Sequence, residues 1–273
     1  DLLTSQKANS AAADFIKSKI RQKVNNPTTA DILTNIDHPY AAKRPPIDTH
    51  YFETFNKEHV TLVDLQADPI ATITHNGIAL ESGSHHELDV IVFATGYDAM
   101  TGPLLNLNIE TSKASLKSYW AEGPRNYLGL AIPGFPNLFT ITGPGSPSVL
   151  SNMPVSIEQH VDWITECIAY CIKTECTSIE AQEQSAEIWT DHVRETADAT
   201  LLPKVQHSWY LGANIPGKPR VFMPYAGGLN TYRKICDNIA NEGYKGFVLK
   251  SGKTHETSKP LDFIYSEGVS LGV

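Results

Sequence analysis

Two adjacent cations stand in a loop that proline keeps irregular. Lys43 and Arg44 lie within the segment IDHPYAAKRPPIDT, residues 36–49, whose three prolines exclude regular structure. A lysine ammonium can bind a phosphate as a point charge, and an arginine guanidinium can hold a carboxylate or a developing oxyanion with its planar fork of donors. A solvated basic pair has the same sequence appearance, so the residues alone leave both interpretations open.

Two small-residue turns follow apolar segments that have the composition of strands. The run DVIVFATGYD predicts a strand over Val90–Ala94 that ends at Thr95 and Gly96, where glycine lets the backbone approach a ligand closely. In open α/β sheets, ligands bind outside the carboxyl ends of such strands. The segment NLFTIT leads into the turn GPGSPS, residues 143–148, which resembles half of a dinucleotide fingerprint but has serine where the third glycine belongs. It is therefore a weak pyrophosphate cradle.

The helix after this turn and a later loop tryptophan could also contact a ligand. Ser151 or Asn152 can cap the helix and Pro154 suits its first turn, so free N–H groups and the positive end of the helix dipole could stabilise an anion or an electron-rich ring edge. A capped structural helix would look the same. Trp209 stands in a loop rich in Gly and Pro, where a tryptophan commonly covers a ligand or a neighbouring domain and its indole N–H can donate.

Periodicity and turn residues place the elements that carry these groups. Apolar spacing and caps predict helices over residues 8–24, 28–33, 154–171, 181–199 and 229–241. Short β-branched runs predict strands over residues 60–65, 67–73, 76–80, 87–96, 137–142, 220–225 and 243–249. Because Val90–Ala94 is apolar on both faces, it is expected to be buried between layers of a parallel sheet. The predicted fold class is α/β.

Composition excludes several broad classes of protein. With 273 residues, 41% of them hydrophobic and 19% charged, the chain can bury a substantial core. A formal charge of −8 without any basic run argues against a nucleic-acid partner. No apolar stretch reaches the roughly 18 to 20 residues that span a bilayer, and the first residues lack a signal-peptide layout. A cytoplasmic protein without a membrane segment is expected.

Other residues that could bind metals or act as nucleophiles follow no functional pattern. The four cysteines form no C-x-x-C pair and no zinc spacing with histidine, so they are interpreted as ordinary thiols. His85 and His86 stand beside a β-turn and are expected to be exposed rather than metal-bound. Hydrolase, zincin and P-loop motifs do not occur. The chain begins with Asp1 and its first methionine is Met100, so we expect a piece of a longer chain or one half of a cleaved chain.

Taken together, four segments resemble the C-terminal half of a type I Baeyer–Villiger monooxygenase, of the cyclohexanone, phenylacetone and steroid monooxygenase group. The resemblance extends from the first helix to about Lys250. The segments that carry it are DHPYAAKRPPIDTHYFETFN, DVIVFATGYDAMTG, FPNLFTITGPGSPSVLSNMPVSIEQHVDWI and SWYLGANIPGKPRVFMPYAGGLNTYR.

The resemblance implies a flavoprotein with two Rossmann-like dinucleotide-binding domains and a helical insertion. Residues 1–40 would end the helical subdomain, and residues 41–88 would complete the NADPH-binding domain. Residues 89–250 would be the C-terminal part of the FAD-binding domain, and residues 251–273 a tail. In such an enzyme NADPH reduces FAD, O2 adds at flavin C4a, and the C4a-peroxyflavin attacks a ketone carbonyl to give an ester or lactone.

The resemblance also implies roles for individual residues. Arg44 would be the catalytic arginine that stabilises the peroxide and oxyanion, a role that suits a permanent charge in a water-poor site, and Lys43 would meet the 2'-phosphate of NADPH. Trp209 would contact the nicotinamide cofactor from a mobile loop. The other cofactor-binding residues would be Thr95, Gly96, Asn152 and Met153, and the substrate pocket would be lined by Ser148, Val149, Leu150 and Met153.

A complete enzyme of this kind needs parts that these 273 residues lack. Neither of the two G-x-G-x-x-G cradles is present, nor the fingerprint between them. The N-terminal half of the same enzyme, linked or as a separate chain, is therefore the expected partner, besides a ketone and O2. Two alternatives stay open: a related flavin monooxygenase that oxygenates nitrogen or sulfur, and a non-catalytic remnant or interaction module.

Overall fold

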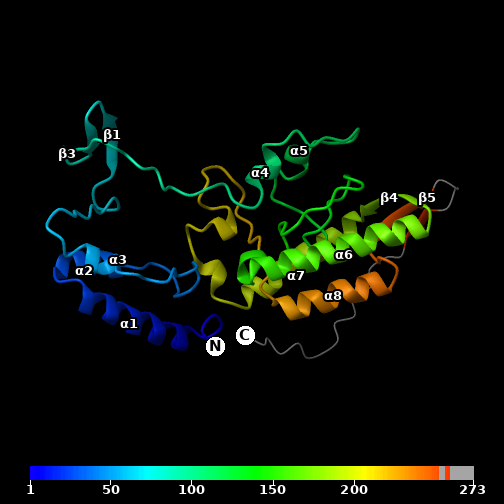
Figure 1. Cartoon of the computed structure of the whole chain (residues 1–273), viewed down its shortest axis with the longest axis horizontal. Coiled ribbons are helices and arrows are strands. Elements are labelled where there is room, and N and C mark those ends of the chain that lie inside the picture. Colours follow the sequence, from blue (N-terminus) through cyan, green and yellow to red (C-terminus); the bar gives the residue numbers. More distant parts are fainter. Residues whose placement is uncertain (252–255, 259–273) are drawn as a thin grey trace. The chain divides into compact units, whose positions relative to one another are not determined.

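A computed structural model of the chain describes residues 1–251 and 256–258 (Figure 1). The chain divides into two compact units, Asp1–Gly96 and Tyr97–Val273, called unit 1 and unit 2 below. Both mix helices with short strands, as expected for part of an α/β protein. Of the predicted tail 251–273, only residues 251 and 256–258 are among the described residues.

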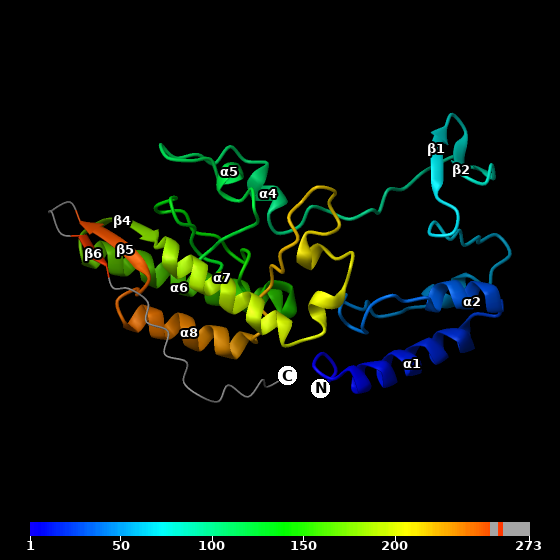
Figure 2. The same cartoon turned by 180° about the vertical axis from the view of Figure 1, so that it is seen from behind.

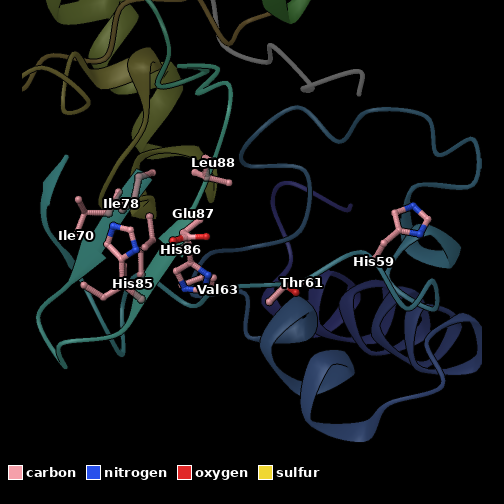
Figure 3. Close-up of a pocket in the computed structure, with 11 residues that line it drawn as sticks. His59, Thr61, Val63, Ile70, Ile78, His85, His86, Glu87 and Leu88 are labelled. Carbon is pink, nitrogen blue, oxygen red and sulfur yellow. The ribbon is translucent and has the colours of Figure 1, made fainter. Parts of the chain in front are cut away.

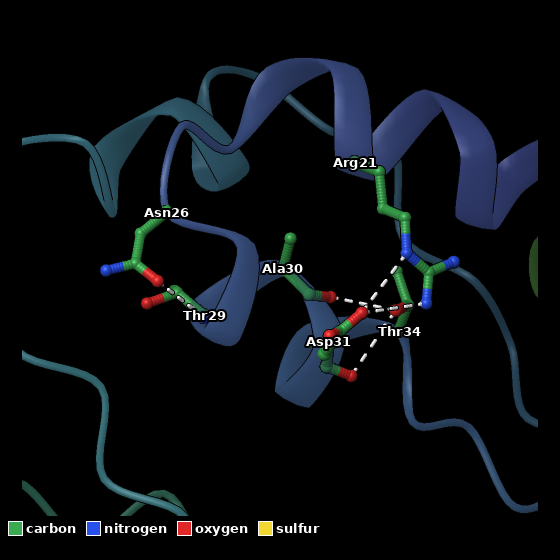
Figure 4. Close-up of polar contacts among 6 residues, drawn as sticks. All are labelled: Arg21, Asn26, Thr29, Ala30, Asp31 and Thr34. Atoms are coloured by element: carbon green, nitrogen blue, oxygen red, sulfur yellow. Dashed lines mark hydrogen bonds and ion pairs between the residues drawn. The ribbon is translucent and has the colours of Figure 1, made fainter.

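Unit 1 begins with a helical hairpin. Its helices are α1, Gln6–Lys23, and α2, Pro27–Thr34, which confirms both predicted helices to within a few residues. Asn26 caps α2 by accepting from the Thr29 N–H at 3.1 Å, and an ion pair of 3.1 Å joins Arg21 to Asp31 across the hairpin (Figure 4). Between the helices a small core is buried, formed by Ile20, Val24 and Ala30.

A short helix and an antiparallel meander follow. The helix is α3, Tyr51–Thr54, and the strands are β1, Ile70–Thr74, β2, Gly77–Leu80, and β3, His85–Glu87, in the order β1-β2-β3. A two-residue turn joins β1 to β2, because Thr74 pairs with Gly77. The strand expected over residues 60–65 is absent, so that prediction was wrong.

The segment after β3 corrects a central expectation. Residues 90–94 were predicted to form a buried strand, but they form no strand, and Val90, Val92 and Phe93 are 74%, 81% and 70% exposed. A strand forms only where a neighbour supplies backbone donors and acceptors, and no described segment of the chain lies beside this one. The segment has the sequence of an inner strand, yet in the described structure it is unpaired and exposed to solvent.

Unit 2 is built on long helices that pack on a small sheet (Figures 1 and 2). The helices are α6, Met153–Lys173, α7, Glu183–Asp198, and α8, Leu229–Asn241, close to the predicted ranges. α6 packs against α8 and against β4, Cys176–Ala181. The apolar residues that repeat every 3.6 positions predicted these helices, and the same residues form the face that each helix buries.

The sheet of unit 2 is antiparallel. β4 pairs with β5, Phe247–Ser251, and β5 pairs with β6, Glu256–Ser258. The expected strand at 243–249 is present but begins later, and β4 was not predicted at all. Within the described residues neither sheet contains a parallel pair, contrary to the expectation of a parallel sheet. Aromatic side chains dominate the core between helices and sheet: Tyr127, Trp163, Trp189, Tyr225, Tyr232 and Phe247.

Shorter elements surround that core. α4, Gly102–Leu105, and α5, Leu116–Tyr119, enclose a second small core. Three single turns of 3-10 helix are η1, Ser148–Leu150, η2, Leu202–Lys204, and η3, Trp209–Leu211. The strands expected over residues 137–142 and 220–225 are irregular, and the first forms only an isolated bridge at Phe139. Among the described helices, none has the length and apolarity that a membrane span requires.

Candidate functional site

The loop that carries Lys43 and Arg44 is held to α1 by one buried asparagine. Asn9 is 1% exposed, and its side-chain amide exchanges two hydrogen bonds of 2.9 Å with the backbone N–H and C=O of Tyr40. Ala42, which stands between that anchor and the cations along the chain, is fully buried, and its N–H donates to the Pro39 carbonyl at 3.1 Å. The start of the loop is thus fixed, although it has no regular structure.

The two cations differ in exposure. Lys43 is half-buried and Arg44 is exposed, and neither makes a hydrogen bond or ion pair with another residue of the described part of the chain. The pKa of the Asp37 carboxyl is lowered, chiefly by the hydrogen bond from His38. The positive charge of Lys43 is one of the smaller causes of this shift. Both side chains therefore remain available to an anion from outside the described residues.

Thr95 and Gly96 end unit 1. Both are exposed, and Gly96 has a φ of +94°, in the left-handed region that favours glycine. A Cβ built on Gly96 would meet no atom within 4 Å. The glycine is needed here for backbone conformation, and the space around it is open.

In unit 2 the predicted substrate-lining and helix-capping residues form one compact group. Ser148, Val149 and Leu150 make up η1, and Asn152 caps α6 by accepting from the Val155 N–H at 3.5 Å. Ser148 is buried with a φ of +45°, so it occupies a conformation that serine seldom adopts. The Sδ atom of Met153 lies 4.0 Å from the Ser148 Oγ atom.

The glycines of the preceding turn serve packing. A Cβ on Gly143 would lie 2.6 Å from the Gly129 carbonyl oxygen, and Gly145, with a φ of +91°, accepts through its carbonyl from the indole N–H of Trp189 at 2.9 Å. Close approach of the Thr140 side chain and the Gly129 backbone therefore explains Gly143, and the left-handed φ together with the nearby Trp189 ring explains Gly145. The structure gives no reason to assign the turn a phosphate-binding role, which agrees with its incomplete fingerprint.

Trp209 belongs to η3, a single 3-10 turn near the beginning of its loop. The side chain is half-buried, and its ring meets that of Tyr210 edge to face, with centroids 4.6 Å apart. Ser208 accepts from the Tyr210 N–H at 3.2 Å and so closes the turn. Backbone hydrogen bonds hold the chain on both sides of the tryptophan, and the mobility that the resemblance implies for this loop stays a prediction.

A shared strip of backbone joins the tryptophan loop to the turn at 143–148. The N–H of Met223 donates to the Tyr210 carbonyl at 2.8 Å, while the Met223 carbonyl accepts from the N–H of Gly145 at 2.7 Å. Tyr225 N–H donates to the Ser146 carbonyl at 2.7 Å. Unit 2 therefore unites Trp209 with η1 and the first turn of α6, while Lys43, Arg44, Thr95 and Gly96 lie in unit 1.

Unit 1 also has an open depression between the segment at 59–65 and the meander (Figure 3). Its volume is about 910 Å³, and its polar lining includes His59, His85, His86 and Glu87. Among the described residues no group of three or more His, Cys, Asp or Glu side chains could hold a metal ion. Of the two histidines that were expected to be exposed, His85 is exposed and His86 is half-buried.

The cysteines behave as ordinary thiols. None forms a disulfide, and Cys167 and Cys236 are buried while Cys171 and Cys176 are half-buried. Burial raises the pKa of the Cys236 thiol to about 12 and raises that of Cys167 as well. These two thiols stay protonated and are poor nucleophiles.

The sequence did not point to Asn9, although it positions the Lys43 loop. A usable signal was present, because Asn9 lies on the side of α1 that also buries Ile20, where an amide needs a specific partner.

Comparison with known proteins gives a consistent result. No family model matches the chain. A Baeyer–Villiger monooxygenase of Pseudooceanicola batsensis is 44% identical over 249 residues, which are 91% of this chain and 45% of that protein. The phenazine N-monooxygenase PhzNO1 of Lysobacter antibioticus is 41% identical over 252 residues, 92% of this chain and 46% of that protein.

Solved structures agree with the sequence relatives. A structure described as oxidized steroid monooxygenase bound to NADP superposes with a TM-score of 0.84 at 47% identity, and the match covers 92% of this chain and 47% of that one. The backbone of this chain is therefore that of roughly half of such an enzyme. The chain belongs to the Baeyer–Villiger monooxygenase family and spans about half the length of the relatives that it matches.

Proposed function

We propose that the chain is the C-terminal portion of a Baeyer–Villiger monooxygenase that uses FAD and NADPH to insert one oxygen atom of O2 beside a ketone carbonyl. The observation that carries the proposal is the similarity over more than nine-tenths of the chain, in sequence and in backbone, to enzymes of that name and to one whose structure holds NADP. The domain limits 1–40, 41–88, 89–250 and 251–273 and the cytoplasmic location remain proposals beside it.

The residues present suit the two cofactors. FAD, when bound, would supply the redox chemistry, with electrons from NADPH and oxygen from O2. The open space at Gly96 admits close approach of a ligand to backbone, and the N-terminus of α6, which Asn152 caps, would present the positive end of its helix dipole to a ring edge or anion. Lys43 lacks a partner among the described residues, as a residue reserved for the 2'-phosphate of NADPH would.

Arg44 is our proposed catalytic residue. A guanidinium keeps its charge at any working pH and offers five donors in one plane, so it can stabilise negative charge that develops on oxygen during oxygen insertion. Its exposure in this chain fits a group that faces a separate part of the enzyme. Lysine is a compact point charge that donates from a single atom, and it would replace Arg44 poorly.

The exposed apolar segment at residues 90–94 supports the proposal that a second half of the enzyme covers this part of the chain. Val90, Val92 and Phe93 expose most of their side chains to solvent, and their backbone groups pair with no described strand. Burying a valine or phenylalanine side chain fully stabilises by about 1.5–3 kcal/mol, so this segment alone favours association. A neighbouring strand from the N-terminal half would satisfy its backbone as well.

A second bare surface lies on α6. One side of this helix is buried against the core of unit 2, while Ile157, Val161, Ile168 and Ile172 form an exposed apolar stripe at spacings of four, seven and four residues. Such spacing keeps all four side chains on one face. A helix that is apolar on two faces is typical of a middle layer, which a sheet or helix of the missing half would cover.

The test of the proposal uses the native protein that contains this chain, linked or with its co-purifying partner. Intact mass and flavin absorbance come first, followed by NADPH oxidation and mass spectrometry of products formed from a panel of cyclic and linear ketones. Flavin-dependent conversion of a ketone to its ester or lactone is expected. A colourless protein of 30.0 kDa that oxidises no NADPH would contradict the proposal and favour the non-catalytic remnant.

Arg44→Ala sharpens that test. It is expected to leave reduction of the flavin by NADPH largely intact and to lower ester formation by about a hundredfold or more, because charge stabilisation on oxygen is lost. Arg44→Lys should recover little. Arg21→Ala is the matched control, since Arg21 is an arginine of the same unit whose ion pair, with Asp31, joins α1 to α2. Ester formation that survives in Arg44→Ala would show that the arginine is assigned wrongly.

One relative favours a second candidate function. The name of the Lysobacter protein states N-oxygenation of a phenazine, and this chain is 41% identical to it. The product assay therefore includes an aromatic N-heterocycle beside the ketones. Formation of an N-oxide without any ester would replace ketone oxygenation by nitrogen oxygenation as the function.

A further inference from the structure

The tryptophan loop of unit 2, residues 206–223, is closed at its base by an arginine. The Arg220 guanidinium donates to three backbone carbonyls, those of Pro203, Val205 and Gln206, at 3.2, 2.6 and 2.6 Å. Backbone bonds between the two sides of the loop, such as Val221 N–H to the Leu211 carbonyl at 3.1 Å, complete the closure. The loop is a built structure and not a loose connection.

The far end of the same loop is fastened to a segment remote in sequence. Lys218 makes an ion pair with Asp98, and the Asn214 side-chain amide donates to the Tyr97 carbonyl at 3.1 Å. The Lys218 side chain is only 13% exposed and that of Asp98 is 36% exposed, so water competes weakly for the pair. Asp98 follows Gly96 by two residues along the chain.

Each partner of the ion pair rests on a glycine that leaves it room. A Cβ built on Gly102 would lie 2.7 Å from both Cβ and Cγ of Asp98. A Cβ built on Gly212, whose φ is +68°, would lie 3.3 Å from Cδ of Lys218. Any other residue at Gly102 would push Asp98 aside, and at Gly212 it would crowd the lysine stem and strain the turn directly after η3.

We propose that Asp98 and Lys218 form a clamp that holds the loop with Trp209 in its cofactor-facing position. They are positioning residues, because they act through the loop and through Trp209. The inference rests on the proposed function in one respect only, namely that Trp209 contacts the nicotinamide cofactor. The ion pair and the Asn214 bond tie the loop to Tyr97 and Asp98, the first two residues of unit 2.

The clamp makes two measurable predictions for Lys218→Met and Asp98→Asn in the native protein. Cleavage by chymotrypsin within residues 209–211, located by mass spectrometry, should accelerate about five- to tenfold, because loss of one partly buried ion pair opens the loop by that factor. The dissociation constant of NADP+, and the KM for NADPH, should rise by a similar factor, while the flavin content and kcat change little. Lys218→Arg, which keeps the charge, should resemble the parent.

The double variant Asp98→Asn/Lys218→Met separates a clamp from general damage. Because both residues act through one contact, its effect should equal that of either single variant. Lys245→Met is the matched control, since Lys245 also pairs with a carboxylate in unit 2, Glu242, at 3.3 Å but lies outside the loop.

The possible negative results distinguish a wrong clamp assignment from a wrong function. Unchanged cleavage in both single variants, or additive effects in the double variant, would overturn the clamp. Faster cleavage with unchanged NADP+ binding would overturn its positioning role. A parent protein that binds no NADP+ would contradict the proposed function, and the cleavage rates would still decide whether the clamp exists.

Discussion

Replacing His160 by asparagine is expected to flatten the pH dependence of the stability of unit 2. His160 lies on α6 and is fully buried. Its Nδ1 atom accepts from the Thr142 N–H at 2.9 Å, so the proton is on Nε2, which has no partner among the described residues. A second ring proton would point at the N–H of Thr142, and burial lowers the pKa of His160 from 6.5 to about 4.

The sign of the effect follows from the two pKa values. Between about pH 4 and 6.5 the unfolded chain binds a proton at His160 that the folded chain does not, so the free energy of unfolding increases with pH over this window. The contribution is complete above pH 6.5 and is lost as the pH falls towards 4. At about 1.4 kcal/mol per pH unit, it amounts to about 3 kcal/mol.

Urea unfolding between pH 4.5 and 7.5, followed by tryptophan fluorescence, measures this contribution. All four tryptophans of the chain lie in unit 2, so the signal reports that unit. In His160→Asn the Oδ1 atom can replace Nδ1 as the acceptor, which keeps the hydrogen bond and removes the titration. The variant should be less stable at pH 7.5, yet lose less stability on acidification.

Two controls test whether the change in pH dependence comes from His160. Burial also lowers the pKa of His192, but that histidine is present in both proteins and cancels in their difference. His207→Asn makes the same substitution at an exposed position of unit 2 and should leave the slope as in the parent. Parallel slopes for the parent and His160→Asn would refute the reasoning, because a buried neutral imidazole would then contribute nothing to the acid sensitivity.

Two further substitutions test the packing of unit 2. Gly246→Ala should destabilise by more than about 2 kcal/mol, because its φ is +84° and a Cβ would lie 2.6 Å from the Tyr127 hydroxyl. Gly134→Ala, with a φ of +81° and no atom within 4 Å of a Cβ, should lose only about 1 kcal/mol in the same urea titration, and equal losses would exclude a steric contribution. Trp189→Phe should lose about 3 kcal/mol, since it reduces a fully buried side chain and leaves the partly buried Gly145 carbonyl without its 2.9 Å donor; a loss below about 1 kcal/mol would mean that another donor replaces the indole.

The sequence predicted the long helices well because their determinants are local. α6 illustrates this: Asn152 as cap, Pro154 in the first turn and an apolar period together define its start and its buried face. Lys43, Arg44 and Trp209 could be singled out by residue type and loop setting. Their roles remain proposals, because a role depends on a ligand and on a second half that residue type does not supply.

Contacts that join distant segments could not be predicted in the same way. The pair Asp98 and Lys218 looks like two surface charges in the sequence, and only folding shows that Gly102 and Gly212 make room for it. The order of the tryptophan loop has the same origin. Arg220 closes its base, but two of the three carbonyls that accept from this arginine, those of Pro203 and Val205, belong to the segment before the loop.

The wrong strand prediction at residues 90–94 is the most informative difference. The sequence indicates a segment suited to burial on both faces, yet Val92 is 81% exposed, because strand formation needs a neighbour and none of the residues that the structure describes provides one. The same combination of apolar sequence and solvent exposure occurs in α6, on the apolar stripe that ends at Ile172. A chain optimised to be complete would place charges at both surfaces. Two independent elements that retain interior sequences at exposed positions therefore argue for a partner half that covers them, and against a free-standing remnant, in which such residues would be a liability for aggregation.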